Sequence, residues 1–378
     1  MQRIATVATI IIALLICDLS SVAKTAEPAA GKNWPLFRGD AQATGMAHGK
    51  LPDKLELLWK FTVEGGAFEG TPAIVDGVAY IGDMDGKLYA LNLPDGKELW
   101  AFKVDSGFIA SPAVRDGHVF IGDIDGRCYC VNAKSGKEKW KFAAEAEVDS
   151  SANFWKENVL FGSQDRHLYC VNAESGKEVF KYAIDDQIRC TPTVVGDRCF
   201  VAGCDSKLHI IDLNKGGAIA DAPIDAPTGV TPAVLGQNVF LGTEGGAFFC
   251  IDWKEAKVVW RVEDQGAAQP FRSSPAVAED IVVVGSRNRS VQAFEPSTGK
   301  ELWSFASKQR IDSSPVIVGD RVFAAAADGR IYAIDRKTGK QLWEHQAAGG
   351  FTGSPAVADG KLLIASDRGV VYCFGAQP

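Results

Sequence analysis

The chain has 378 residues, of which 23% are charged and 46% hydrophobic, a composition typical of a folded globular protein rather than a disordered one. The net charge of -7 argues against a nucleic-acid backbone as the main partner, because such a partner requires a basic surface. Nine cysteines are too few for a small disulfide-stabilised scaffold. At roughly 150 residues per domain, length alone predicts two or three domains.

Residues 1–23 have the features of a secretory signal peptide. Arg3 supplies a positive charge, and the apolar run Ile4–Ile16 is too short to span a bilayer comfortably. The small residues around Ala23 predict cleavage after that position and export to the periplasm or cell envelope. Two alternatives remain open: a lipoprotein in which Cys17 carries the lipid, and an N-terminal membrane anchor that is never cut.

From residue 57 onwards the chain repeats with a period of about forty residues. The first marker is Ser/Thr-Pro followed by a small or aliphatic residue, and Ala152 replaces the proline in one of eight copies. The prolines are Pro72, Pro112, Pro192, Pro232, Pro275, Pro315 and Pro355. A fixed period of this kind indicates a repeat architecture rather than two or three unrelated domains.

Two further markers recur at a fixed phase within each copy. An Asp-Gly turn joins two alternating apolar strands, as in the segment 82–89, and this is a strong hairpin signal. A Gly-Lys-Glu-x-Trp motif follows, as in the segment 96–100. The tryptophans at this repeat position are Trp59, Trp100, Trp140, Trp260, Trp303 and Trp343. Each unit therefore predicts four short strands, here called A to D, and eight such units predict an all-β, eight-bladed β-propeller of four-stranded antiparallel blades.

The two ends of the repeat region complement each other. The eighth copy stops after its C strand, at 370–374, whereas residues 57–61 form a D strand with no preceding A, B or C strand. We expect the N-terminal strand 57–61 to pair into the last blade and close the ring, which removes the open sheet edges. The predicted organisation is a signal peptide at 1–23, a preceding segment at 24–56 and a single propeller at 57–378.

Position within the repeat also suggests structural roles. Strand A should be innermost, because proline suits an edge strand, and strand D outermost, with tryptophan filling the gap between diverging blades. Asp83 and Asp123 are interpreted as turn residues, and His209 as a packed, half-buried imidazole. The eight cysteines after residue 23 are expected to be mostly free, buried thiols.

The loops from strand D to the next strand A vary most, so they are the candidate binding face for a ligand or protein partner. A mixed-charge ring is predicted near the channel mouth, above an apolar ring one residue earlier in each copy. The charged candidates are Glu69, Asp149, Arg189, Arg272 and Asp312. The apolar candidates are Phe68, Phe108, Phe271 and Phe351. The alternative interpretation is a set of solvated loop-end charges that pair across blades.

The repeat, with its Gly-Lys-x-x-Trp strand, resembles the pyrroloquinoline-quinone-like (PQQ-like) propeller repeat of the quinoprotein alcohol dehydrogenase-like superfamily, over about residues 57–376. The segment Trp34–Asp40 resembles the stretch that precedes many such propellers. The resemblance implies two eight-bladed branches, the quinoprotein dehydrogenases and the BamB-like scaffolds of outer-membrane protein assembly. A repeat of this kind indicates a fold more strongly than a function.

The dehydrogenase branch holds its quinone beside a calcium ion, usually with a disulfide between adjacent cysteines. The sequence contains neither a Cys-Cys pair nor a Cys-x-x-Cys-His haem motif, and no metal-ligand spacing or nucleophile motif. We therefore expect no catalytic residue, metal or cofactor, and an exported, monomeric, non-enzymatic scaffold that binds protein partners, in the setting of envelope protein assembly. Membrane attachment would require lipidated Cys17. The alternative is a PQQ-dependent dehydrogenase or a small-ligand sensor.

Overall fold

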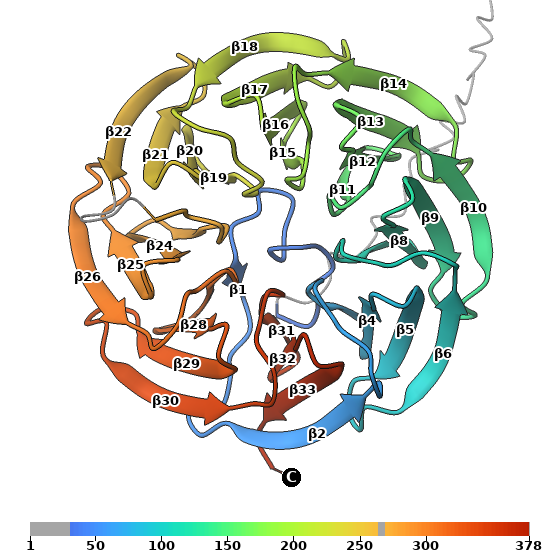
Figure 1. Cartoon of the computed structure of the whole chain (residues 1–378), viewed down its shortest axis with the longest axis vertical. Coiled ribbons are helices and arrows are strands. Elements are labelled where there is room, and N and C mark those ends of the chain that lie inside the picture. Colours follow the sequence, from blue (N-terminus) through green and yellow to red (C-terminus); the bar gives the residue numbers. More distant parts are fainter. Residues whose placement is uncertain (1–30, 264–268, 378) are drawn as a thin grey trace, which may run out of the picture.

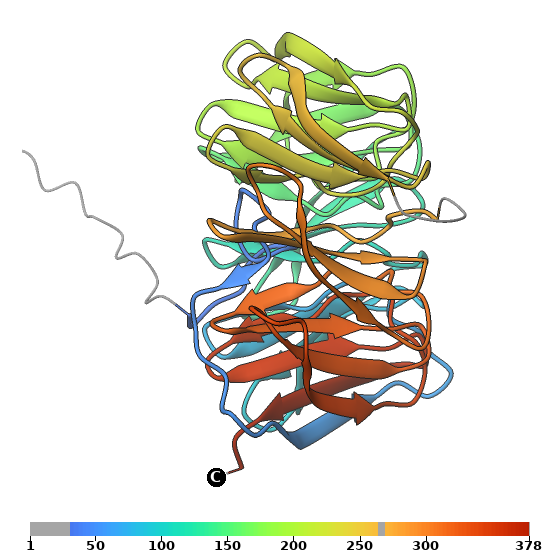
Figure 2. The same cartoon turned by 90° about the vertical axis from the view of Figure 1, so that its left-hand side faces the viewer.

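The computed structural model describes residues 31–263 and 269–377, and these form eight β-sheets arranged as blades around a central axis (Figure 1). Seen from the side, the ring is a short cylinder (Figure 2). The described residues contain 33 strands and no helix, so no helix capable of crossing a membrane is found among them. The all-β, eight-bladed prediction is confirmed.

The first four blades follow one another without interruption. Blade 1 consists of β3 (Ala73–Val75), β4 (Val78–Gly82), β5 (Lys87–Asn92) and β6 (Glu98–Lys103). Blade 2 consists of β7 (Ala113–Arg115), β8 (His118–Gly122), β9 (Arg127–Asn132) and β10 (Glu138–Ala143). Blade 3 consists of β11 (Asn153–Trp155), β12 (Asn158–Gly162), β13 (His167–Asn172) and β14 (Glu178–Ala183). Blade 4 consists of β15 (Thr193–Val195), β16 (Arg198–Ala202), β17 (Lys207–Asp212) and β18 (Gly217–Pro223).

The remaining blades complete the circle, and the last one contains both ends of the propeller. Blade 5 consists of β19 (Ala233–Leu235), β20 (Asn238–Gly242), β21 (Ala247–Asp252) and β22 (Lys257–Glu263). Blade 6 consists of β23 (Ala276–Ala278), β24 (Ile281–Ser286), β25 (Ser290–Phe294) and β26 (Glu301–Ala306). Blade 7 consists of β27 (Val316–Val318), β28 (Arg321–Ala325), β29 (Arg330–Asp335) and β30 (Gln341–Gln346), joined by the short strand β1 (Met46–Ala47). Blade 8 consists of β31 (Ala356–Ala358), β32 (Lys361–Ala365), β33 (Val370–Gly375) and β2 (Glu56–Thr62).

Ring closure by the N-terminal strand is also confirmed. β2 pairs antiparallel with β33, and Trp59 lies opposite Cys373. The observed strand is slightly longer than the predicted 57–61. Blade 8 therefore takes its outermost strand from the beginning of the propeller and its other three from the end.

Tryptophan on the outer strand packs against glycine in the next blade. The Trp100 indole donates a hydrogen bond of 3.0 Å from Nε1 to the carbonyl of Ala133. A Cβ atom added to Gly136 would lie 2.8 Å from the Trp100 ring. The equivalent pairs are Trp59 with Gly96, Trp140 with Gly176, Trp260 with Gly299 and Trp303 with Gly339. The recurring spacing of Trp and Gly in the repeat therefore corresponds to one contact across five of the eight junctions, and Phe180 makes the same contact with Gly216.

Blades 4 and 5 meet differently. Ala220 replaces the outer-strand tryptophan, and Ala256 replaces the glycine of the following turn. Trp253, from blade 5, packs instead against Phe200 of blade 4, with ring centroids 5.7 Å apart. The aromatic side chain that fills this junction therefore comes from the opposite side.

In seven of the eight blades a small residue, Ala or Cys, on the third strand lies opposite the outer-strand aromatic, whereas in blade 4 Ile210 lies opposite Ala220. Cys130 lies opposite Trp140, as Ala90 lies opposite Trp100. All eight described cysteines are free thiols, and only Cys204 is not fully buried. Four of these cysteines, Cys130, Cys170, Cys250 and Cys373, therefore take the place of the small alanine found in other blades.

The aspartates before the Asp-Gly turns have the predicted turn role and a second partner. The Asp83 carboxylate accepts hydrogen bonds from the backbone N–H groups of Asp85 and Lys87, and from the Tyr89 hydroxyl at 2.8 Å. The prediction that His209 is only half-buried was wrong. His209 is only 3% exposed and lies within 2.9 Å of the carboxylates of Asp205 and Asp221.

Candidate functional site

The inner strands surround the axis with a ring of hydroxyl groups. At seven of the eight Ser/Thr positions the backbone N–H donates to the hydroxyl of the next blade, and Ser354 N–H returns to Thr71 Oγ1 at 2.9 Å. Seven of these bonds link Thr71, Ser111, Ser151, Thr191, Thr231, Ser274, Ser314 and Ser354. The hydroxyl groups of these small residues therefore link neighbouring blades around the axis.

The loops between strand D and the next strand A surround a cavity of about 160 Å³ above this ring. All five charged candidates of the predicted binding face line it: Glu69, Asp149, Arg189, Arg272 and Asp312. The repeat therefore placed these residues together correctly, although they are far apart in the chain.

Most of these charges have partners within the propeller. Arg272 Nε lies 2.8 Å from a carboxylate oxygen of Glu244, and Asp312 accepts hydrogen bonds from Arg287 at 2.7 Å and Arg310 at 2.9 Å. These ion pairs agree with the alternative interpretation of the sequence, in which the loop-end charges pair across blades. Two of the five ring charges, Arg272 and Asp312, are thus held in ion pairs with side chains beside the ring.

Asp149 is the exception among the buried charges of this cavity. Its Oδ2 accepts a hydrogen bond of 3.0 Å from Gln164, but its Oδ1 has no partner among the described residues. Burial raises the pKa of Asp149 to about 6, against a smaller opposing effect of the hydrogen bond from Gln164. This carboxyl therefore titrates in a mildly acidic range.

The apolar ring predicted beneath the charges does not form part of the exposed face. Phe68, Phe108, Phe271 and Phe351 are at most 1% exposed. They pack inside the blades, for example Phe108 against Tyr129 with ring centroids 6.2 Å apart. The apolar residue beside each loop-end charge recurs because it belongs to the hydrophobic core. These four phenylalanines therefore cannot contact a partner directly.

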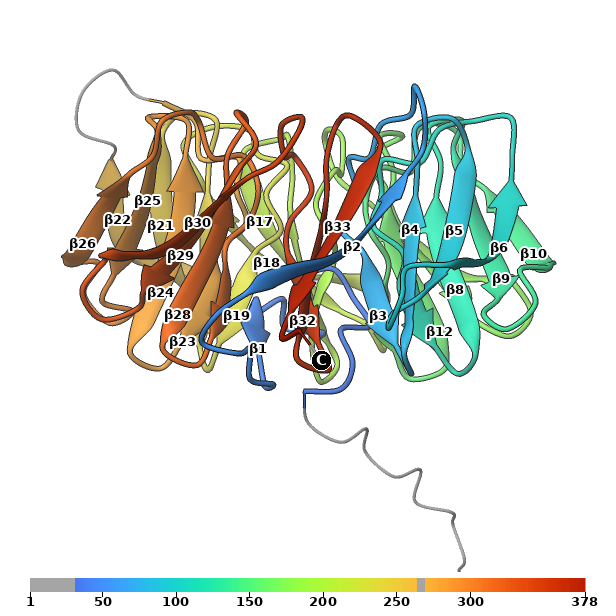
Figure 3. The same cartoon turned by 90° about the horizontal axis from the view of Figure 1, so that it is seen from below.

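The opposite end of the channel is closed by the N-terminal segment, residues 31–55, which lies beside the inner strands (Figure 3, lower edge). Its carbonyl groups accept hydrogen bonds from successive blades, including Val114 N–H to Pro35 and Ile317 N–H to Gly45. The Arg38 side chain is 1% exposed and donates to the carbonyls of Pro275, Ser314 and Pro315. Burial lowers the pKa of Arg38 to about 9, with a smaller opposing effect of Asp40.

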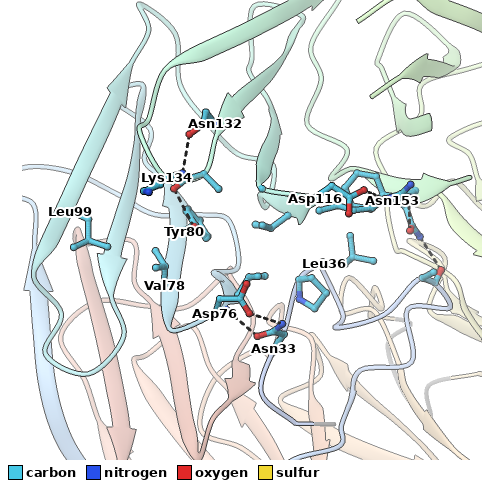
Figure 4. Close-up of a pocket in the computed structure, with 18 of the residues that line it drawn as sticks. Asn33, Leu36, Asp76, Val78, Tyr80, Leu99, Asp116, Asn132, Lys134 and Asn153 are labelled. Carbon is cyan, nitrogen blue, oxygen red and sulfur yellow. Dashed lines mark hydrogen bonds and ion pairs between the residues drawn. The ribbon is translucent and has the colours of Figure 1, made fainter. Parts of the chain in front are cut away.

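A cavity of about 1140 Å³ opens beside this segment, between blades 1 and 2 and reaching blade 3 (Figure 4). Pro35, Leu36 and His48 line it from the N-terminal segment, and Val78, Tyr80, Leu99, Trp100 and Lys134 from the blades. Sequence reasoning missed this site, because it treated the repeated turns of this face as structural and assigned no role to residues 24–56. The one signal of this site in the sequence was that Trp34–Asp40 lies outside the forty-residue repeat, which begins at residue 57.

A quinone with its calcium ion does not fit the axial cavity as it stands. Small-molecule sites usually measure about 300–1,000 Å³, and the axial cavity is smaller. Within residues 31–263 and 269–377, no group of three or more His, Cys, Asp or Glu side chains is placed to hold a metal ion.

The fold and the repeat define an eight-bladed propeller of the PQQ-like class. The model of the family described as outer membrane protein assembly factor BamB matches residues 53–154, 125–221 and 329–378. Together these matches cover more than half of the chain, which therefore belongs to the BamB family. No curated protein sequence matches it significantly.

Several solved structures share the fold at low sequence identity. BamB from Moraxella catarrhalis is 17% identical, with a TM-score of 0.73 over 86% of this chain and 98% of that one. A quinohemoprotein alcohol dehydrogenase from Comamonas testosteroni is 14% identical, with a TM-score of 0.80 over 93% of this chain and 82% of that one. The computationally designed Ika8 protein is 16% identical, with a TM-score of 0.76 over 85% of this chain and all of that one. Such different proteins share the architecture, so the fold alone does not define the function.

Proposed function

We propose that the chain is an exported, non-enzymatic scaffold that binds other proteins during envelope protein assembly. The observation that carries this proposal is the family match, which spans blades at both ends of the propeller. The predicted signal peptide at 1–23 lies outside the described residues and supplies the route of export. In this proposal the mature protein works in the periplasm as a monomer, or at a membrane if Cys17 is lipidated.

In-cell cross-linking followed by mass spectrometry tests the proposal most directly, because it identifies the partner. We expect cross-links to components of the envelope assembly machinery. Recovery of the chain with no cross-linked protein would contradict a scaffold role.

The loop end of the channel is the first candidate interface, and two arginines there provide its test. Arg189→Glu and Arg272→Glu together reverse two charges at the cavity mouth, so they should reduce co-purification of a partner bound there. The control is Lys177→Glu with Lys337→Glu, which makes the same change in charge at exposed turns of the opposite face. Equal recovery from both variants would remove the loop end from consideration.

The second candidate function is a quinone-dependent dehydrogenase or a small-ligand sensor. The structural similarity to a quinohemoprotein alcohol dehydrogenase, with a TM-score of 0.80, supports this second candidate. Purified mature protein would be mixed with pyrroloquinoline quinone and calcium and examined for a bound chromophore and dye-linked alcohol oxidation. A positive result in both assays would overturn the non-enzymatic proposal.

A further inference from the structure

Two neighbouring grooves on the N-terminal face of the ring are related by the forty-residue repeat, yet only one is filled. Between blades 2 and 3, the Phe154 ring packs 5.3 Å from Phe120, which itself lies 5.8 Å from Trp140. Lys139 Nζ and a carboxylate oxygen of Glu174 form an ion pair of 2.6 Å across the junction. Only about 220 Å³ of space remains there.

The groove between blades 1 and 2 has the same aromatic floor, but it lacks the additional ring and the ion pair that fill the groove between blades 2 and 3. Tyr80 and Trp100 remain in contact, with ring centroids 5.9 Å apart, at the positions of Phe120 and Trp140. Val114 stands where Phe154 supplies its ring, and Leu99 and Lys134 stand where Lys139 and Glu174 form their ion pair. The result is the cavity of about 1140 Å³ (Figure 4).

Two exposed side chains lie at the mouth of the open groove. Leu99 is 55% exposed, as is Leu342 at the equivalent position of blade 7, so the feature particular to this groove is the neighbouring lysine. Among the described residues, Lys134 forms no ion pair with any carboxylate, whereas the lysine of the filled groove does. Compared with the filled groove, the open groove thus lacks the aromatic ring at position 114 and the carboxylate at position 134, while Asp76 and Asp116 line its inner part.

The size and walls of the groove favour a peptide over a small molecule. Its volume exceeds the roughly 300–1,000 Å³ of typical small-molecule sites. Pro35 and Leu36 of the N-terminal segment form its inner wall, so the cavity extends from the rim of the ring towards the axis. An extended segment could follow this course with a side chain turned onto the aromatic floor.

We propose that this groove binds a peptide segment of a protein partner that presents an aromatic side chain beside a carboxylate. The aromatic ring lies on Tyr80 and Trp100 and replaces Phe154 of the neighbouring groove. The carboxylate pairs with Lys134 and replaces Glu174. This inference rests on the proposed scaffold function and adds the chemistry of the partner and a second interface, at the end of the ring away from the variable loops.

The test uses a displayed library of random octapeptides and the purified mature chain. Wild type should enrich peptides that carry Phe, Tyr or Trp within two residues of Asp or Glu. Leu99→Lys with Lys134→Glu installs the ion pair of the filled groove, so it should weaken binding of the enriched peptides at least tenfold. Lys134→Glu alone should shift the preference to Lys or Arg beside the aromatic residue, because the charge at the groove is reversed.

The matched control is Leu342→Lys, which makes the same substitution at the equivalent outer-strand position of blade 7, where the leucine is also 55% exposed. It should bind the enriched peptides as wild type does. All variants should unfold at the wild-type temperature, since the changed side chains are exposed. Failure to enrich aromatic–acidic peptides, or equal binding by wild type and the double variant, would overturn the proposal.

Photo-cross-linking in cells separates this inference from the function on which it rests. A cross-linkable residue at position 99 should capture a protein partner through an aromatic–acidic segment, and one at position 342 should not. Capture only from position 189, at the loop end, would leave the scaffold function standing and overturn the groove. Capture of a second copy of this chain, or of its own N-terminal residues, at position 99 would also overturn it. Absence of cross-links from every position would contradict both proposals.

Discussion

The two ends of the axial channel are built in opposite ways. At the loop end the sequence varies from blade to blade, yet Arg272 and Asp312 are held in ion pairs with neighbouring side chains and the cavity measures only about 160 Å³. At the other end the turns repeat, yet one non-repeated segment crosses the axis, buries Arg38 and borders a cavity of about 1140 Å³. The difference teaches that sequence variability within a repeat does not by itself locate an open site, because a segment outside the repeat can break the symmetry more strongly.

The tryptophan–glycine junctions lie at the end of the ring opposite the variable loops. Their disruption should have the largest effect on stability. Trp100→Ala should lower the free energy of unfolding by about 3–5 kcal/mol, because it removes the ring that fills the junction and its hydrogen bond to Ala133. Chemical denaturation measures the change. Leu99→Ala, on the exposed neighbour, is the control, and a wild-type midpoint for Trp100→Ala would contradict the junction role.

The buried Arg38 provides a second test of the difference between the two ends of the channel, because it lies in the N-terminal segment at the end opposite the variable loops. Arg38→Ala leaves three carbonyl groups without their donor and should cost about 3 kcal/mol of unfolding free energy. Arg38→Met restores most of the volume without the donors, so its loss should be smaller. Thermal melts that place both variants at the wild-type temperature would show that the N-terminal segment is not held through this side chain.

Glycine at the junction can be tested against the junction of blades 4 and 5, where alanine replaces it. Gly136 has φ +69° and faces Trp100, so Gly136→Ala should destabilise the protein by about 2–3 kcal/mol. Ala256 occupies the same repeat position with φ 50° and has no tryptophan above it, so Ala256→Gly should change stability by less than about 1 kcal/mol. Equal effects of the two substitutions would break the explanation of blades 4 and 5.

The smallest predicted effect lies at the loop end and depends on pH. Because the folded state raises the pKa of Asp149 from 3.8 to about 6, it binds that proton more tightly than the unfolded chain does. This contribution to stability is present below about pH 4 and is lost as the pH rises to about 6. Asp149→Asn should therefore raise the free energy of unfolding at pH 7 by about 1–2 kcal/mol and flatten its pH dependence between pH 4 and 7.

The control for Asp149 is Asp312→Asn, which should destabilise the protein at pH 7 because Asp312 accepts hydrogen bonds from two arginines. Stability measured by urea denaturation across this pH range compares them. A loss of stability in both variants would show that Asp149 is as well satisfied as its neighbour.

The sequence predicted the fold well because the repeat samples each environment eight times. Trp59 without preceding strands and a last copy without its tryptophan were enough to predict how the ring closes, and β2 confirms it. The same repetition misled the site prediction for Phe68 and its equivalents, because a periodic apolar residue beside a loop is as compatible with the core as with a surface. Nothing periodic describes residues 31–55, so neither Arg38 nor the open groove beside Leu36 could be predicted.

The blade shared by both ends of the chain has a consequence for folding. Ser354 and Thr71, which complete the hydroxyl ring, are separated by 283 residues, and β2 cannot find its partner strand until β33 has been delivered. Contacts of such sequence separation form slowly, because the loop between them must first be ordered. During folding the leading strand would therefore have an unpaired edge while seven blades assemble behind it. Removal of β33, residues 370–375, should leave a nearly complete propeller that cannot close.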